Sequence, residues 1–345
     1  MVVGHAGQGG FGLDGLEHGR RRPGKETLFY YAFEPESVPV SRLLPLLFLA
    51  CLALPAQADV RLLASIKPLQ LIAAAVQDGV GQPEVLLPPG ASPHQYALRP
   101  SDVRRVREVD LLYWVGPDLE GFLPRVLEGR SKPSVAVQSL PGMTLRHFEA
   151  IGHDEHEHGA EDEHEHDHDH RPGSLDAHLW LLPANARVIA ARMAADLAVA
   201  DPANATRYQA NLNAFGERLD LLDARLKARM AAVAGKPFFV FHEAFDYFEA
   251  AYGLRHAGVF SVAAEVQPGA RHVAAMRARL QKAGPSCVFN EPPVRPRLAE
   301  TLTAGLPVRL AELDALGMQA PLDAGGYEAL LENLGTGLAG CLEKL

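Results

Sequence analysis

Two groups of residues in this chain have side chains that could bind a metal ion. The first is the tract HDEHEHGAEDEHEHDHDH, residues 153–170, which is built almost entirely from histidine and acidic residues. The second consists of His94, His178, His242 and Asp314, which are isolated in the sequence and mostly follow short apolar runs. Imidazole nitrogens and carboxylate oxygens are both metal ligands, so each group predicts a metal site.

The isolated residues favour zinc. Three imidazoles with a carboxylate or a water make a tetrahedral set, which zinc accepts at nitrogen distances of about 2.0–2.1 Å. Harder cations such as manganese favour more oxygen ligands, although a manganese or iron site remains an alternative. A single histidine near a strand end also has an ordinary role as a hydrogen-bonded core residue. His147, His256 and His272 lack a comparable context and are interpreted as surface or rim residues.

The tract is predicted to be a mobile loop and an accessory metal site. A flexible segment loses conformational entropy when it wraps a metal, whereas ligands held by packed elements lose less. We therefore expect weak binding that captures zinc when it is scarce, or passes it to the cleft. The alternatives are a solvated acidic loop with incidental affinity, and a zinc buffer or chaperone acting through the tract. Its histidines are His153, His156, His158, His164, His166, His168 and His170.

Catalysis is the less favoured interpretation of the isolated histidines. The run HEAFD, which starts at His242, begins like a zinc-protease HExxH motif, but Asp246 stands where the second histidine belongs. A secreted zinc hydrolase with Glu243 as general base is the remaining enzyme alternative. No G-x-S-x-G motif and no nucleophile–base pair is apparent, so we expect a binding protein rather than an enzyme.

The N-terminal part of the chain predicts export. Residues 41–58, SRLLPLLFLACLALPAQA, combine a basic start, a short apolar stretch and an A-x-A cleavage site, as in a secretory signal peptide. Residues 1–40 precede it and are interpreted as a misassigned N-terminal extension. A lipid anchor at Cys51 is disfavoured because apolar sequence continues beyond it. We expect a monomer in the periplasm, with no membrane insertion of the mature chain.

Composition and cysteine content agree with this class of protein. The formal net charge of −9 and the absence of a basic patch argue against nucleic-acid binding. Cleavage would remove Cys51 and leave Cys287 and Cys341. In an oxidising compartment, these two are either a disulfide or a pair of buried thiols.

The arrangement of apolar runs predicts an α/β fold with two lobes. Short apolar strands alternate with helical patterns in residues 59–200, and again in residues 235–345, which is typical of mostly parallel sheets flanked by helices. Between them, residues 201–234 carry apolar positions at three- and four-residue steps and predict one long linking helix, with Asp201 as its N-cap. Ligands of open α/β sheets bind beyond the carboxyl ends of the strands, where most of the isolated candidates fall.

Six motifs in this order resemble the zinc-specific substrate-binding proteins of bacterial ABC importers. They are GASPHQYALRPSD, DAHLWLLPANA, the helix starting DPANA, FVFHEAFDYF with YGL, CVFNEPPVRP, and LDALG. The resemblance covers essentially the whole mature chain. It implies Zn²⁺ bound in a cleft by His94, His178 and His242, a disulfide between Cys287 and Cys341, and delivery to an inner-membrane permease with its cytoplasmic ATPase.

The resemblance also bears on metal choice and on the fourth ligand. The related manganese-binding proteins typically carry glutamate where His242 stands, which favours zinc here. Pro93 replaces a glutamate that joins the metal in some relatives, Gln95 replaces a common aspartate, and Ala177 a common proline. The fourth metal ligand is therefore expected to be water or Asp314.

Overall fold

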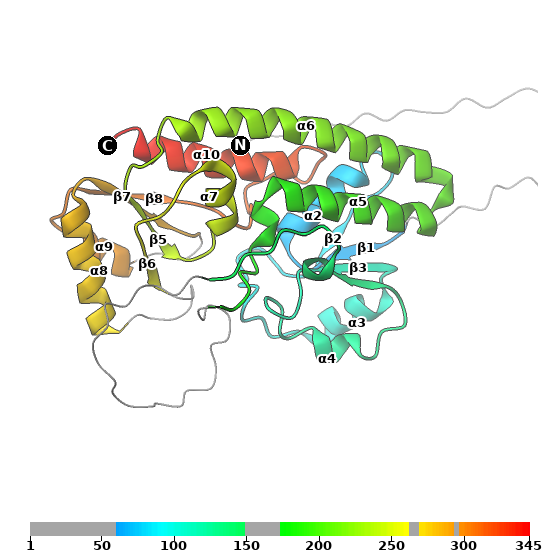
Figure 1. Ribbon diagram of the computed structural model, residues 1–345. Helices are drawn as coiled ribbons and strands as arrows, with labels where there is room; N and C mark the ends of the chain where they lie inside the picture. The colour runs from blue at the N-terminus through cyan, green and yellow to red at the C-terminus, as the bar shows by residue number, and fades with distance from the viewer. Residues whose placement is uncertain (1–59, 149–172, 262–268, 293–296) are drawn as a thin grey trace, which may run out of the picture. The chain divides into compact units, whose positions relative to one another are not determined.

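The computed structural model describes residues 60–148, 173–261, 269–292 and 297–345 (Figure 1). The predicted N-terminal extension 1–40, the predicted signal peptide 41–58 with Cys51, and the histidine-rich tract 153–170 lie outside the described residues. Among the residues that the structure describes, no helix combines the length and apolar character needed to cross a membrane.

The first sheet has four parallel strands in the order β2-β1-β3-β4. They are β1 (Leu62–Ala64), β2 (Glu84–Val85), β3 (Leu111–Trp114) and β4 (Ser134–Ala136). Its helices are α2 (Lys67–Val76), α3 (Pro100–Glu108) and α4 (Pro124–Leu127). β1 and β3 are buried throughout, as expected for central strands of a parallel sheet covered on both faces. The strands are shorter than the apolar runs that predicted them.

The second sheet repeats this arrangement, with four parallel strands in the order β6-β5-β7-β8. They are β5 (Phe238–His242), β6 (Gly258–Ser261), β7 (Ser286–Asn290) and β8 (Val308–Glu312). The helices of this half are α7 (Asp246–Tyr252), α8 (Ala270–Ala283) and α9 (Arg297–Thr303). The fold class predicted from the sequence is therefore confirmed.

The long linking helix is α6 (Ala205–Ala231), with 27 residues. A 3₁₀ turn at Pro202–Asn204 precedes it, so Asp201 lies at the start of this turn rather than at the N-cap of the α-helix. α6 packs against α2 and α5 (Pro183–Ala200), and also against α7 and α10 (Gly326–Leu342) (Figure 1). Its buried face consists of Tyr208, Asn211, Phe215, Leu219, Leu222, Leu226 and Met230.

Helix α10 is absent from the sequence prediction. Its glycines weaken the helical pattern, because glycine is a poor helix former. At Gly335 the helices approach closely: a Cβ there would come within 2.4 Å of Leu226 Cδ2 on α6, so the Leu226 side chain would have to move. α10 also contacts α2, β7 and β8, so it belongs to the layer that connects both halves.

The two halves share one buried core. A single hydrophobic cluster includes Leu63 and Tyr113 from the first sheet and Val240 and Phe289 from the second. A smaller cluster around Phe260 and Leu280 lies in the second half alone. Because close-packed cores resist continuous deformation, we expect small movements between the halves rather than a wide hinge.

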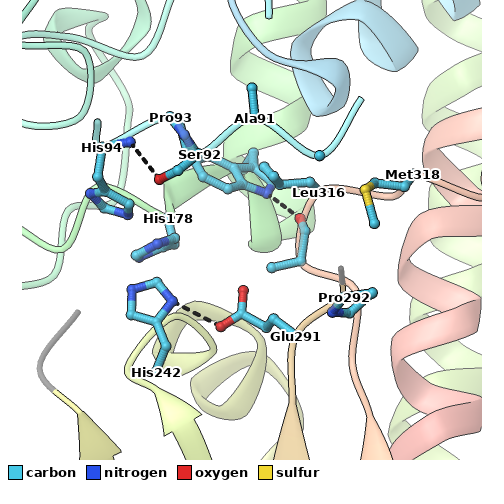
Figure 2. A pocket seen from close by; sticks show the side chains of 13 residues that line it. Ala91, Ser92, Pro93, His94, His178, His242, Glu291, Pro292, Leu316 and Met318 are labelled. Carbon is cyan, nitrogen blue, oxygen red and sulfur yellow. Dashed lines mark hydrogen bonds and ion pairs between the residues drawn. The ribbon is translucent and has the colours of Figure 1, made fainter. Parts of the chain in front are cut away.

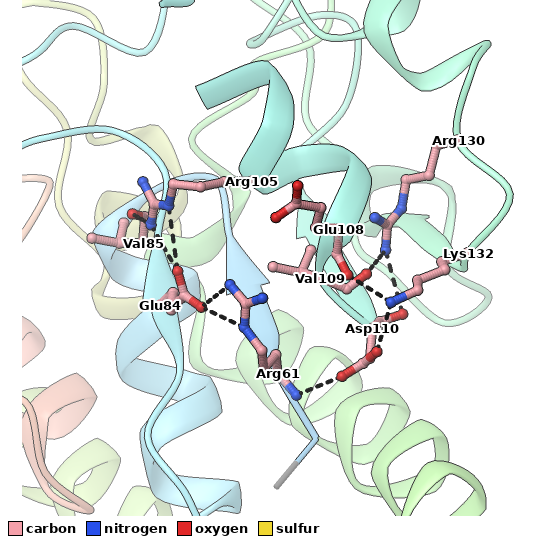
Figure 3. A network of polar contacts seen from close by, with 9 residues as sticks. All are labelled: Arg61, Glu84, Val85, Arg105, Glu108, Val109, Asp110, Arg130 and Lys132. Carbon is pink, nitrogen blue, oxygen red and sulfur yellow. Dashed lines mark hydrogen bonds and ion pairs between the residues drawn. The ribbon is translucent and has the colours of Figure 1, made fainter. Parts of the chain in front are cut away.

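A network of ion pairs links the first strands to α3 (Figure 3). Glu84 at β2 accepts hydrogen bonds from the guanidinium groups of Arg61 and Arg105, the shortest at 2.9 Å and 3.2 Å. Asp110 accepts the backbone N–H of Arg61 at 3.0 Å and pairs with Lys132 at 2.8 Å. These side chains are partly exposed, so each pair contributes at most about 1 kcal/mol, and the network mainly sets the position of α3.

Candidate metal centre

The structure brings together three of the four isolated candidates, His94, His178 and His242 (Figure 2). One ring nitrogen from each lies within 4.8 Å of the other two. The ring centroids are 5.0 Å apart for His178 and His242, 5.4 Å for His94 and His178, and 5.5 Å for His94 and His242. Tetrahedral zinc requires nitrogens about 3.4 Å apart, so small side-chain shifts would complete the site.

Each histidine comes from a different part of the fold. His242 is the last residue of β5, at the carboxyl edge of the second sheet, where the strand-end rule places ligands. His178 directly precedes the 3₁₀ turn Leu179–Leu181 that leads into α5. His94 lies in the loop between β2 and α3, so the site is assembled from both halves.

The loop that carries His94 is attached to the start of α3. Asp102, on the first turn of α3, accepts the backbone N–H of Arg99 and the hydroxyl of Tyr96, both at 3.0 Å. The Tyr96 ring packs edge-on against Phe122, with centroids 5.8 Å apart. These contacts fix Tyr96 and Arg99 against α3. They therefore restrict the loop that carries His94.

Two of the histidines have a carboxylate partner that the sequence analysis did not single out. The Nδ1 of His178 lies 2.8 Å from Asp176 Oδ1. The Nδ1 of His242 lies 2.8 Å from Glu291 Oε1 (Figure 2). In the tautomer that donates Nδ1–H to the carboxylate, Nε2 is left to bind a metal. Such partners orient a metal-binding imidazole and make it more basic. The DAH spacing and the NEP run after β7 are local signals that could have identified them.

The site is electrostatically suited to a cation. Burial and the two neighbouring histidines lower the pKa of His178 well below its ordinary value, so this imidazole stays neutral and ready to bind metal. Burial raises the pKa of Asp176 to about 7, although the backbone N–H of His178 opposes the shift. A divalent cation would favour the ionised carboxylate.

Phe148 and Gly173 are the described residues on either side of the histidine-rich tract, and Gly173 is close to His178 in sequence. The backbone N–H of Phe148 donates to Ser174 at 3.0 Å, and that of Gly173 donates to Phe148 at 2.9 Å. Tyr247 OH accepts the backbone N–H of Arg146 at 2.8 Å and donates to the carbonyl of Asp176 at 2.9 Å. The two chain ends that flank the tract are therefore held together beside the segment that leads to His178.

The surrounding pocket is mostly apolar and joins the two halves. The indole N–H of Trp180 donates to the carbonyl of Ala315 at 2.8 Å, and the Trp180 and His178 rings lie 5.3 Å apart. The other apolar lining residues are Ala91, Pro93, Pro292, Leu316 and Met318. An apolar surround limits water around the histidines, which strengthens electrostatic interactions with a bound cation.

Asp314, the fourth candidate, has a different environment. Its carboxylate accepts the backbone N–H of Leu316 at 3.1 Å and that of Met318, which makes a tight turn after β8. The group of possible ligands around the three histidines does not include it among the described residues. Lys67 Nζ donates to the carbonyl of Met318 at 2.9 Å and holds the same turn. Metal binding by Asp314 stays a prediction.

Replacing Asp176 by asparagine tests its role as the partner of His178. The amide keeps an oxygen acceptor but removes the charge that polarises the imidazole, so we expect zinc affinity to fall by about 10- to 100-fold. A chelator competition titration measures the change. Asp201→Asn is a matched control, because Asp201 is a buried carboxylate bonded to Asn204 and Tyr208 outside the pocket. Equal losses in both variants would contradict a specific role for Asp176.

Comparison with known proteins agrees with these observations. The family model described as zinc-uptake complex component A, periplasmic, matches residues 62–341. The high-affinity zinc uptake system protein ZnuA of Yersinia pestis is 40% identical over 293 residues, covering 83% of this chain and 92% of its own. The protein of the same name from Paracoccus denitrificans is 37% identical over 307 residues, covering 84% and 94%.

Solved structures share the fold at lower identity. A crystal structure of ZnuA aligns with a TM-score of 0.67 at 21% identity, covering 82% of this chain and 99% of its own. FpvC of Pseudomonas aeruginosa, solved with Mn²⁺, aligns with a TM-score of 0.68 at 20% identity, covering 83% and 99%. The match over residues 62–341 and the 40% identity establish that this chain belongs to the ZnuA family, the periplasmic component A of zinc-uptake complexes.

Proposed function

We propose that this protein captures Zn²⁺ with His94, His178 and His242 and delivers it to an ABC-type import permease and its ATPase. One observation carries the proposal: three imidazole nitrogens from separate elements lie within 4.8 Å of one another. The names of the relatives, which are zinc uptake proteins, support zinc as the transported ion. Zinc is then the cargo and not a catalytic cofactor.

A binding role is favoured over hydrolysis by the position of Glu243. A zinc hydrolase needs a general base beside the metal-bound water, and Glu243 was the candidate. Glu243 is not among the residues that line the pocket, and its carboxylate instead faces Asp246 and His256. Glu243 is therefore not placed to act as the base of a zinc hydrolase at the histidine site.

The proposal places the mature chain in the periplasm after cleavage behind Ala58, as a monomer. The family description, which is periplasmic, supports this location. The proposed lobes are residues 59–200 and 235–345, with residues 201–234 between them. Zinc would bridge them, and the shared core would keep the accompanying movement small.

Metal competition tests the proposed cargo. The unaltered protein is expected to prefer Zn²⁺ over Mn²⁺, because three neutral imidazoles suit zinc whereas manganese favours oxygen ligands. His242→Glu, which replaces one nitrogen by carboxylate oxygens, is expected to shift the ratio of the two affinities toward manganese. Calorimetric titration with each metal measures this ratio. A preference of the unaltered protein for manganese would contradict the proposed cargo.

The proposed accessory role of the tract has a distinct pH dependence. Histidines in a polar segment titrate near a pKa of about 6.5, so protons displace zinc from the tract below that pH. Burial and the neighbouring histidines lower the pKa of His178, so protons compete less well with zinc for this side chain than for the histidines of the tract. Equilibrium dialysis at pH 7.5 and pH 6 is expected to show loss of the weakly bound zinc first. Simultaneous loss of the tight zinc would contradict this order.

A further inference from the structure

A second group of possible metal ligands includes Glu243, the residue that follows His242 in the chain. Glu243, Asp246 and His256 each offer one ligand atom, and these atoms lie within 4.8 Å of one another. Glu243 directly follows β5, Asp246 is the first residue of α7, and His256 lies between α7 and β6. The group contains one nitrogen ligand and two carboxylates, and it shares no residue with the cleft histidines.

The imidazole of this group is held by a third carboxylate. Glu249 accepts the backbone N–H of His256 at 2.9 Å, and its two oxygens lie 3.0 Å and 3.1 Å from His256 Nδ1. Asp246 Oδ1 lies 3.7 Å from the same nitrogen. His256 is therefore oriented by its neighbours, as metal-binding histidines usually are.

Glu243 lacks a hydrogen-bond donor of its own. Its exposed fraction is only 6%, and none of the hydrogen bonds between described residues reaches its carboxylate. An ionised carboxylate that is buried without donors costs free energy, and a bound cation removes that cost. A carboxylate on a largely buried residue that faces an imidazole and a second carboxylate is the feature that points to a cation.

The charges around the group also favour a cation. Three carboxylates, Glu243, Asp246 and Glu249, face one imidazole. From other elements, Asp176 adds negative charge and Arg146 adds positive charge to the surroundings of Asp246.

We propose that Glu243, Asp246 and His256 form a second binding site for a divalent metal ion such as Zn²⁺, separate from the cleft site. Glu249 positions His256 in this site through its hydrogen bonds to the backbone and the ring. Since Glu243 is the chain neighbour of His242, an ion here is close to the cleft ion. Their mutual repulsion makes the second site the weaker one, filled after the cleft.

Zinc-edge anomalous diffraction from crystals of the full chain, soaked with Zn²⁺ alone, tests the proposal directly. The expected map has one peak among the three cleft histidines and a second peak among Glu243, Asp246 and His256. A cleft peak without the second peak, at zinc concentrations that saturate the protein, would overturn the proposal. The group would then be an ion pair of protonated His256. Absence of the cleft peak would count against the proposed function instead, so the two failures are distinguishable.

Variants provide an independent measurement in solution. In the double variant Asp246→Asn/His256→Gln, equilibrium dialysis is expected to show one fewer zinc per chain, or at least tenfold weaker binding of that zinc. Binding of the tight zinc should be unchanged. The matched control is His272→Gln, a histidine of the same half whose Nε2 lies 3.3 Å from the carbonyl of Val259 and which belongs to neither group. Equal stoichiometry in the double variant and the control contradicts the site; if the double variant does not fold, the anomalous map of the unaltered protein decides.

Discussion

Replacing His242 by alanine is expected to weaken tight zinc binding by about 100- to 1,000-fold. Structural zinc sites bind with about 10–16 kcal/mol, so each of four ligands contributes about 3–4 kcal/mol, and about 1.4 kcal/mol corresponds to a tenfold change. His242 holds its position through β5 and through Glu291, so alanine also leaves that carboxylate without its partner. A zinc titration against a competing chelator measures the loss.

Deletion of the histidine-rich tract tests whether tight zinc binding depends on the tract rather than on the three histidines. A chain lacking residues 153–170 is expected to keep one tight zinc, because the three cleft histidines are held by packed elements and not by the tract. The control for the point variant is His272→Ala, which removes an imidazole of the same half outside both ligand groups. If the tract deletion abolishes tight binding while His242→Ala keeps it, the receptor site is in the tract and the buffer interpretation gains support.

Loss of the Cys287–Cys341 disulfide is expected to lower the free energy of unfolding by about 4 kcal/mol. The two cysteines are 54 residues apart in sequence, and the chain-entropy model gives this value for a loop of that length. The bond joins β7 to α10, the helix that also packs on α6 and α2. For a domain of this size the expected decrease in Tm is of the order of 10 °C.

Urea denaturation of Cys287→Ala/Cys341→Ala measures this loss. Reduction of the unaltered protein is the matched control, because it removes the covalent link without deleting sulfur atoms from the core. Neither cysteine lines the pocket, so tight zinc binding should persist in both forms below their unfolding transitions. Unchanged stability of the reduced protein would show that the link contributes little, and any loss in the double variant would then reflect packing alone.

Part of the candidate site could be predicted from a local rule. His242 ends a strand that reads as an apolar run, and the carboxyl ends of parallel strands are where ligands gather. The same alternation of apolar runs and helical patterns predicted the two sheets and the long helix α6. The disulfide implied by the family resemblance is confirmed. Periodicity and residue type are properties of short stretches, so they can be read without knowledge of the fold.

The tertiary structure decided which side chains act together. Glu291 became the partner of His242 through packing, because the two lie 49 residues apart, whereas Asp176 is only two residues from His178 in sequence. The chain contains many other acidic residues that could have filled the role of Glu291. His256 appeared to be an ordinary rim residue in sequence, yet the turn after α7 brings it beside Asp246 and Glu243.

The sequence by itself determined the fold class, the three histidines that meet in the cleft and the cysteine pair, because each follows from local periodicity, residue chemistry or an ordered set of motifs. Only the tertiary structure decided the length of each strand, the presence of α10 and the shared core. Gly335 illustrates the reason: it weakens a helix when read locally, but a Cβ at that position would displace the Leu226 side chain where α10 approaches α6. Contacts between residues distant in sequence depend on the packed chain as a whole, and no single stretch encodes them.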